Sequence, residues 1–261
     1  MTAEAFERAV LGRTGLSVGR LGVSAGYGVP AAAVERAFEH GVNYLYWGSM
    51  RRGGFAGALR HLAPQRGRVV LVIQSYSRVA ALVGWSVERA LRALRFDYAD
   101  ALLLGMWNGV PPRILEAARK LQKRGLVRHL AVSTHQRSLV PGIAAGHDFD
   151  IVHFRYNAAH PGAEQDIFPH LPAADAAGTV AYTATSWRQL LKPRNTPPGD
   201  KTPTAADCYR FVLSRPEVNV CMTGPSNAAQ MEEALEALRR GPMSPEELAW
   251  MRRVGKKVSG K

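Results

Sequence analysis

Short apolar runs alternate with longer amphipathic stretches along most of the chain. The runs are rich in Val, Ile, Leu and Tyr, and a nearly continuous apolar character is typical of parallel strands that are covered on both faces. The predicted strands lie within residues 20–26, 43–48, 68–75, 99–106, 127–134, 150–157, 179–185 and 218–225.

Between these runs, apolar residues recur at three- and four-residue steps, as in Val83, Val87, Leu91 and Leu94. This period indicates amphipathic helices. The clearest span residues 31–40, 83–94, 112–124, 204–214 and 228–240. Alternating strands and helices are compatible with a closed barrel or an open doubly wound sheet. Eight repeats in 261 residues favour an α/β fold, a (β/α)₈ TIM barrel, because such barrels have roughly 250 residues.

Three segments lie outside the repeat, within what we expect to be a single barrel domain over residues 1–261. Residues 10–18 predict an N-terminal hairpin. Ser244 and Glu247 form the pattern of a capping box, which predicts an extra C-terminal helix. Residues 192–203 contain four prolines and no periodicity, and they fit a lid over the barrel mouth and a surface linker equally well.

Composition limits the classes of partner. The formal net charge is +13, but Lys and Arg are spread along the chain and mixed with Glu, without a nucleic-acid-binding motif, so we expect no nucleic-acid partner. No apolar run is long enough for a membrane span, and the first residues lack a signal-peptide core. A cytoplasmic protein with two reduced thiols, Cys208 and Cys221, is therefore expected.

The carboxyl ends of the strands build the active site of a (β/α)₈ barrel. None of the predicted strands ends in Asp or Glu, which argues against a hard-metal hydrolase and for an anionic or electron-rich ligand. The strand ends and the loops after them instead carry Tyr46, Trp47, Arg51, Tyr76, Trp107, His135, Arg155, Tyr156 and Tyr182.

Several short motifs recur along the chain at residues 11–16, 41–43, 98–100, 125–128, 132–133, 156–157 and 224–227, with Gln230 and Glu233. In this order they resemble the aldo-keto reductases, in particular their bacterial branch related to potassium-channel β-subunits. The resemblance implies a barrel that binds NADP(H) extended across its C-terminal face.

Members of that family reduce carbonyls with a tetrad of Asp, Tyr, Lys and His, in which Tyr donates the proton. Transferred onto this sequence, none of the four residue types is retained. The tetrad positions fall on Tyr46, Arg51 (or Met50), Ser75 and Gly105. Since a general acid contributes about 10²–10⁴ in rate, the usual carbonyl reduction is expected to be weak.

The resemblance implies more retention at the cofactor end. The expected nicotinamide contacts are Ser133 and Tyr182, while a Gln of the family falls on His153. The expected pyrophosphate and adenosine contacts are Ser226, Asn227, Gln230 and Glu233. Backbone N–H groups at a helix start bind phosphate in any case, but residues 225–230 offer no basic side chain for a 2′-phosphate.

We predict catalytic roles for Tyr46, Arg51, His135 and His153. Tyr46 is either a replacement acid or a space-filling ring. Arg51 and Arg155 can bind an anionic substrate through charge-assisted pairs, although Arg155 can equally pair with Glu164 or Asp166. No metal is expected, because the histidines lack a third ligand. The predicted walls of a substrate pocket are Trp47, Tyr76, Trp107, Arg155 and Trp187.

Three functions remain open at this point. The first is an NADP(H)-dependent oxidoreductase with an atypical site, acting on a small anionic or conjugated molecule. The second is a non-redox isomerase, lyase or cyclase that uses Tyr, His and Arg. The third is a non-catalytic barrel that senses the cofactor. Binding of NADPH separates the second function from the other two.

Overall fold

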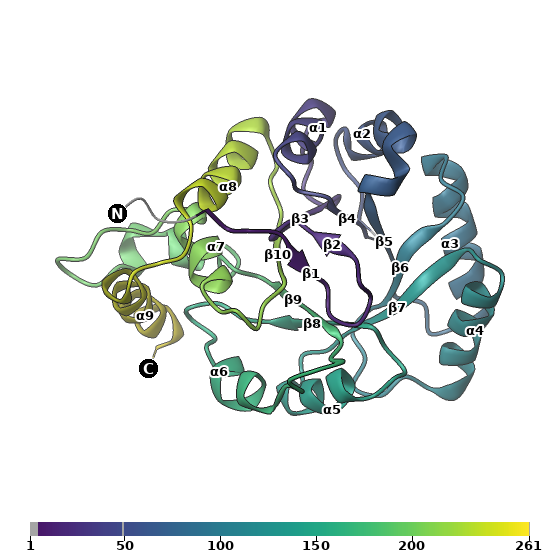
Figure 1. Cartoon of the computed structure of the whole chain (residues 1–261). Helices are drawn as coiled ribbons and strands as arrows, with labels where there is room; N and C mark the ends of the chain where they lie inside the picture. Colours follow the sequence, from purple (N-terminus) through teal and green to yellow (C-terminus); the bar gives the residue numbers. More distant parts are fainter. Residues whose placement is uncertain (1–4, 49, 261) are drawn as a thin grey trace.

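The structure, a computed structural model, describes residues 5–48 and 50–260. Eight parallel strands close into a barrel in the order β10-β3-β4-β5-β6-β7-β8-β9 (Figure 1). They are β3 (Leu21–Ser24), β4 (Tyr44–Trp47), β5 (Val70–Ser75), β6 (Ala99–Leu104), β7 (Val127–Ser133), β8 (Ile151–Arg155), β9 (Gly178–Tyr182) and β10 (Val220–Thr223). Each overlaps the apolar run that predicted it, so the predicted (β/α)₈ barrel is confirmed.

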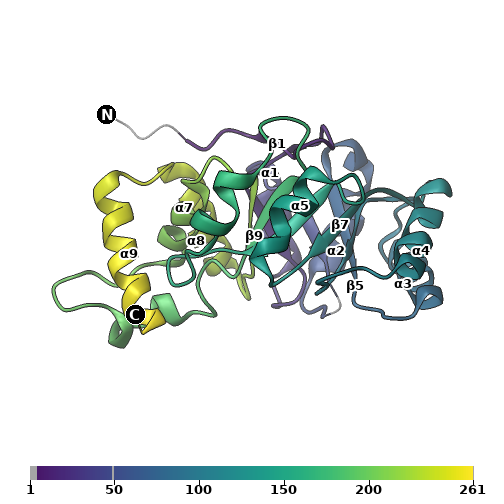
Figure 2. The ribbon, with the colours of Figure 1, turned by 90° about the horizontal axis from the view of Figure 1, so that it is seen from below.

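Helices surround the barrel, and those whose bounds were predicted agree to within one turn (Figures 1 and 2). They are α1 (Ala31–Glu39), α2 (Phe55–Leu62), α3 (Ala80–Leu94), α4 (Pro112–Lys123), α5 (Val140–Ala145), α6 (Ala163–Asp166), α7 (Ala205–Leu213) and α8 (Ala228–Arg240). Short 3₁₀ turns are η1 (Ala63–Arg68), η2 (Arg137–Leu139), η3 (Phe168–His170), η4 (Gln189–Leu191) and η5 (Pro193–Asn195). Within the described residues, no helix combines the length and apolar character of a membrane span.

Side chains alternate between two cores along each strand. On β4, Tyr44 lies inside the barrel in one cluster with Val70, and Tyr46 packs against that cluster. Leu45 and Trp47 belong to the larger cluster between the barrel and the helices. This alternation decides which strand residues can face a cavity inside the barrel.

The predicted N-terminal hairpin is present as β1 (Ala9–Val10) and β2 (Ser17–Val18), which pair antiparallel. Between them, Leu11 is fully buried in the core inside the barrel. Gly12 has φ +49°, and a Cβ there would lie 2.2 Å from the backbone nitrogen of Gly178. Only glycine allows this approach, through which the hairpin covers one end of the barrel.

Arg13 fixes the hairpin to the barrel through backbone carbonyls. Its guanidinium donates to the oxygens of Ala144 at 2.7 Å and Phe149 at 3.3 Å, and also to Gly146 and Asp175. One side chain therefore satisfies carbonyls of several segments at once.

The extra C-terminal helix is α9 (Pro245–Ser259), and its predicted capping box is confirmed. Residues 192–203 lie beside this helix (Figure 2). The indole of Trp250 donates to the carbonyl of Lys201 at 3.0 Å, and Arg253 forms two hydrogen bonds with Asp200 at 2.6 and 3.0 Å. Residues 192–203 are held by α9, and none of them lines the main pocket. The segment therefore fits a surface linker better than a lid over the barrel mouth.

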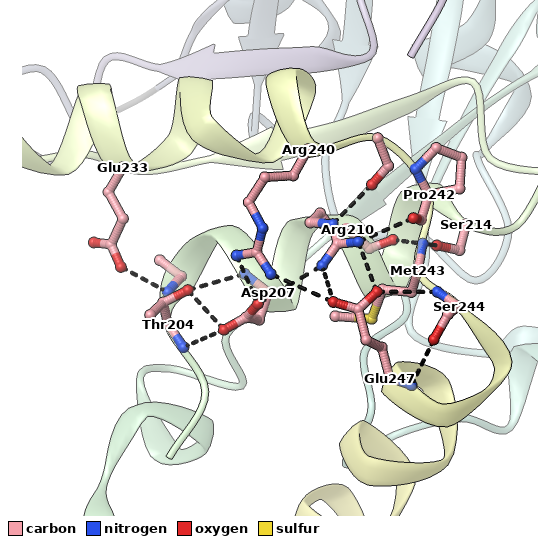
Figure 3. A network of polar contacts seen from close by, with 12 residues as sticks. Thr204, Asp207, Arg210, Ser214, Glu233, Arg240, Pro242, Met243, Ser244 and Glu247 are labelled. Atoms are coloured by element: carbon pink, nitrogen blue, oxygen red, sulfur yellow. Dashed lines mark hydrogen bonds and ion pairs between the residues drawn. The ribbon is translucent and has the colours of Figure 1, made fainter. Parts of the chain in front are cut away.

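A buried polar network joins α7 to the end of α8 and the start of α9 (Figure 3). Arg210 of α7 is only 3% exposed. Its guanidinium donates to both oxygens of Glu247 at 2.6 and 2.7 Å, and to the carbonyls of Gly241 and Pro242 at 2.7 and 2.9 Å. Paired in this way, a charge can remain buried.

The same network reaches the N-terminus of α7 (Figure 3). Asp207 forms a capping box with Thr204 and an ion pair with Arg240 at 2.9 Å. Next to it, the backbone N–H of Ala205 donates to Glu233 of α8 at 2.9 Å. The network therefore positions Glu233, one of the residues expected at the cofactor.

Replacement of Arg210 by Met should lower the free energy of unfolding by about 3 kcal/mol, because it leaves the part-buried carboxylate of Glu247 and the carbonyls of Gly241 and Pro242 without their buried donor. Urea denaturation followed by circular dichroism measures this change. The matched control is Arg239→Met, which removes an exposed arginine paired with Glu236 and should cost less than about 1 kcal/mol. Equal losses in the two variants would contradict the assigned role of the network.

Candidate active site

A pocket of about 550 Å³ opens at the carboxyl ends of the barrel strands. All eight strands or the residues directly after them contribute to it, through Ser24, Tyr46, Gln74, Leu103, Ser133, His153, Tyr182 and Thr223. The loops, α7 and α8 add, among others, Tyr27, Tyr76, Met106, Trp187, Arg188, Tyr209, Ser226, Gln230 and Glu233. The fold thus collects residues from the whole chain around one cavity, where (β/α)₈ barrels carry their sites.

The floor of the pocket consists of phenol and imidazole groups. The hydroxyl of Tyr44 and Nε2 of His153 lie 2.8 Å apart in a hydrogen bond between two fully buried rings. The ring of Tyr46 lies above this pair, with its centroid 6.5 Å from that of His153. These side chains come from β4 and β8, which lie on opposite sides of the barrel, so they meet because both strands turn them inward.

Burial keeps the floor uncharged. It lowers the pKa of His153 to about 3, so its imidazole is neutral at physiological pH. Burial, followed by the neighbouring phenols of Tyr76 and Tyr44, raises the pKa of Tyr46. Among the described residues no cation lowers the pKa of Tyr46, so Tyr46 can donate a hydrogen bond but is a weak acid.

Gly105 leaves room for two of the lining side chains. A Cβ at this position would lie 2.5 Å from Cε1 of Tyr76 and 2.6 Å from Nε2 of Gln74. The resemblance transferred the family histidine to Gly105, and any side chain there would collide with both neighbours. Tyr76 and Gln74 therefore occupy the space at this position.

Gln74 was not predicted from the sequence, which transferred the family lysine onto Ser75. In the structure Ser75 points towards α3, where its hydroxyl accepts from Ser86 at 3.4 Å. Gln74 points inward, is 5% exposed and lines the pocket. Val70 and Val72 precede Gln74 on the same strand at steps of two and also point inward. Strand alternation could therefore have predicted that Gln74 points inward.

The other end of the pocket lies at the start of α8. The side chain of Asn227 caps this helix by accepting from the N–H of Gln230 at 2.9 Å. The amide oxygen of Gln230 accepts from the N–H and the hydroxyl of Ser226 at 2.8 and 2.9 Å. Ser226, Gln230 and Glu233 line the pocket as predicted, whereas Asn227 acts as the cap behind them.

The loop after β9 is held in an uncommon conformation beside the pocket. Thr183, Ser186, Trp187 and Arg188 all have φ between +49° and +66°. Residues other than glycine adopt this region at a cost of about 1 kcal/mol each, and such residues gather at functional sites. Trp187 was expected in the wall, but Arg188 was missed because the conformation that turns it to the pocket has no sequence signal.

Ser133 and Tyr182 line the pocket, as predicted. The hydroxyl of Ser133 accepts from the backbone N–H of Met106 at 2.9 Å. That of Tyr182 donates to the carbonyl of Thr134 at 3.0 Å and lies 3.0 Å from Nδ1 of His135. Both side chains are thereby fixed at the wall.

Several residues predicted at the pocket do not line it, among them Trp47 and Arg51. Trp47 faces outward, with its ring 6.3 Å from that of Phe55, because its neighbour Tyr46 faces inward. Arg51 lies over Trp47 at 4.8 Å and donates to the carbonyl of Gly48, so it follows Trp47 away from the floor. Tyr156 also faces outward, towards Glu164.

Trp107, predicted in the wall, also does not line the pocket. It stacks with Arg78, whose guanidinium carbon is 3.6 Å from the ring centroid, and it packs against the outer core. The preceding residue, Met106, lines the pocket instead and has φ +61°. The turn at Met106 therefore directs the side chain of Met106 into the pocket and that of Trp107, the predicted wall residue, away from it.

Arg155 and His135 lie at the rim rather than on the floor. The guanidinium of Arg155 is 5.8 Å from the ring of Trp187. Glu164 and Asp166, its expected alternative partners, pair with other arginines. Burial, and then the charge of Arg155, lowers the pKa of His135.

Comparisons with known proteins agree with this architecture. The profile of the Aldo/keto reductase family matches residues 81–207. An aldo-keto reductase from Bacillus halodurans in its holo form superposes with a TM-score of 0.76 at 18% identity, over 95% of this chain and 96% of that one. No curated protein sequence matches the chain.

Two structures from Klebsiella pneumoniae are similar in the same way. An aldo/keto reductase in complex with NADP and acetate has a TM-score of 0.73 at 22% identity over 95% of both chains. An aldo-keto reductase in complex with NADPH has a TM-score of 0.72 at 23% identity, over 97% of this chain and 95% of that one. The predicted resemblance is thus confirmed for the fold and for residues 81–207.

The neutral state of His153 makes stability depend on pH. Its folded pKa is about 3, below that of an exposed histidine near 6.5, so the unfolded chain binds the proton first as pH falls. The stability that neutral His153 contributes is therefore complete above about pH 6.5 and is lost as pH falls towards 3.

Nuclear magnetic resonance of the imidazole tests this assignment. The His153 signal should not titrate between pH 5 and 8 in the folded protein, and should titrate normally in urea. His153→Gln, which removes the group, assigns the signal. A folded-state titration of His153 near pH 6.5 would contradict the neutral floor.

Proposed function

We propose that this protein is an NADP(H)-dependent oxidoreductase whose active site uses uncharged phenols in place of the usual tetrad. The observation that carries the proposal is the continuity of one pocket from Tyr46 and His153 to the start of α8. A cofactor extended across the barrel mouth needs such a path between a site for the reacting ring and a site for phosphate.

The residues at the cofactor end fit NADP(H). The first turn of α8 offers backbone N–H groups and a partial positive charge, which suit a pyrophosphate. Arg188 faces the same pocket and forms no ion pair with the described residues, so it is available for a 2′-phosphate. Ser133 and Tyr182, which line the same pocket, would hold the nicotinamide end. The structures from Klebsiella pneumoniae that contain NADP and NADPH support this choice of cofactor.

When bound, NADP(H) supplies or accepts the hydride, and the residues of this chain position the other reactant. Tyr46 and Tyr76 can donate hydrogen bonds to a substrate oxygen, and the amide of Gln74 lies beside them. Burial raises the pKa of Tyr46, which makes proton donation slow. The site therefore favours a substrate already activated by conjugation over a simple aldehyde or ketone.

The rim of the pocket supports a large apolar substrate. Tyr27, Tyr76, Met106 and Trp187 line it, although each is more than 40% exposed. Exposed aromatic side chains gathered at one cavity are typical of a surface that binds a flat apolar molecule. We therefore propose a conjugated, largely uncharged substrate rather than the anionic one that Arg51 and Arg155 suggested.

The non-redox alternative has less support. It relied on two arginines that hold an anion against acidic and basic groups on the floor. Arg51 stacks on Trp47 and does not line the pocket, Arg155 lies at the rim, and His153 is buried in a neutral pair. A barrel that only senses the cofactor remains a possible outcome of the experiment below.

Titration with NADPH, followed by its fluorescence, should show saturable binding. Arg188→Gln should weaken NADPH binding by about tenfold or more, because it removes a charge-assisted contact, and should change NADH binding little. Tyr46→Phe should leave NADPH binding unchanged and reduce the rate of NADPH oxidation with a conjugated enone by at least about tenfold.

The matched control is Arg113→Gln, which removes the same charge from the exposed surface of α4. Binding without any turnover on a panel of carbonyls and enones would identify a sensor. Absence of NADPH and NADH binding at millimolar concentration would overturn the proposed function.

A further inference from the structure

A second pocket, of about 290 Å³, lies at the opposite end of the barrel. It is built from the hairpin, the end of α1, the segment before β5 and the starts of β6 and β7. Its lining is Arg8, Leu16, Ser17, Phe38, Gly41, Asn43, residues 66–70, Tyr98, Asp100 and Arg128. The strands that enter the active site at their carboxyl ends border this pocket at their amino ends, so the two cavities are separate.

Four arginines line this second pocket against a single carboxylate. The carboxylate of Asp100 is 2% exposed and already neutralised, since it accepts from Arg66 and from the backbone of Leu71, both at 2.8 Å. Arg8, Arg68 and Arg128 form no ion pair with any residue in 5–48 or 50–260. The pocket therefore carries an uncompensated positive charge.

Two of these guanidinium groups contact the same aromatic ring. The guanidinium carbons of Arg66 and Arg128 lie 3.7 and 3.8 Å from the ring centroid of Tyr98. These cation–π contacts hold both arginine side chains at the wall of the pocket. An anion bound in the pocket would offset the positive charge that the four arginines bring there.

The arginines differ in how many donors are free. The guanidinium of Arg8 donates hydrogen bonds to the hydroxyl and the carbonyl of Ser17 and to the carbonyl of Gly41. Arg68 donates once, to Gln65 at 2.5 Å. The guanidinium of Arg128 donates to none of the residues that the structure describes. Arg68 and Arg128 thus have N–H groups available to a ligand.

We propose that this pocket binds the phosphoryl group of a small molecule. Guanidinium groups recognise phosphate through paired hydrogen bonds that combine charge with geometry. A volume of about 290 Å³ suits inorganic phosphate or a small phosphomonoester and is small for a dinucleotide. The site is therefore distinct from the cofactor pocket in both place and size.

Calorimetric titration of the full chain with inorganic phosphate and with glycerol 2-phosphate tests the proposal, against chloride at matched ionic strength. We expect one site per chain. Arg128→Gln and Arg68→Gln should each weaken binding by about tenfold or more, and Arg128→Lys by less, because lysine keeps the charge but loses the paired geometry. The tighter of the two ligands shows whether the free ion or the ester is held.

Arg113→Gln serves as the control for a general loss of positive charge and should bind like the parent protein. Circular dichroism and the urea midpoint confirm that each variant is folded. The phosphoryl site is refuted if neither ligand binds at a concentration of roughly 10 mM. It is also refuted if both arginine variants bind phosphate as well as the control does.

Discussion

The alternation of side chains along closed parallel strands is the constraint on which the active site depends. A strand that turns Tyr44 and Tyr46 into the barrel must turn Leu45 and Trp47 towards the helices. A closed barrel has no free edge, and a slip of one residue would place the wrong set of side chains inside. The identity of the pocket floor therefore follows from the register of the strands.

That constraint gives a floor of hydrogen-bonding groups without charge. Tyr46, Tyr76 and Gln74 can orient a substrate oxygen, and burial keeps Tyr46 and His153 uncharged at physiological pH. Buried charge occurs instead where partners surround it, as at Arg210. Under the proposed function a bound cofactor would supply the reactivity, and the side chains of the floor would position the substrate.

The fold was predictable because its signals are periodic. Apolar runs, helical periods, the hairpin and the Ser244–Glu247 capping box all agree with the structure. The site was predictable where a residue lies on a strand of known inward register, as for Tyr46 and His153. Gln74 could have been found in the same way. Trp107 and Arg188 could not, because adjacent backbone torsions with positive φ at residues other than glycine decide their directions.

Hydrogen exchange of the full chain with and without NADPH, measured by mass spectrometry, tests most directly whether one pocket joins the phenol floor to α8. The account predicts slower exchange in residues 183–188 and 226–230 together when NADPH is present, with no change in the hairpin at residues 9–18. Protection that is absent at saturating NADPH, or that falls outside these segments, would contradict it.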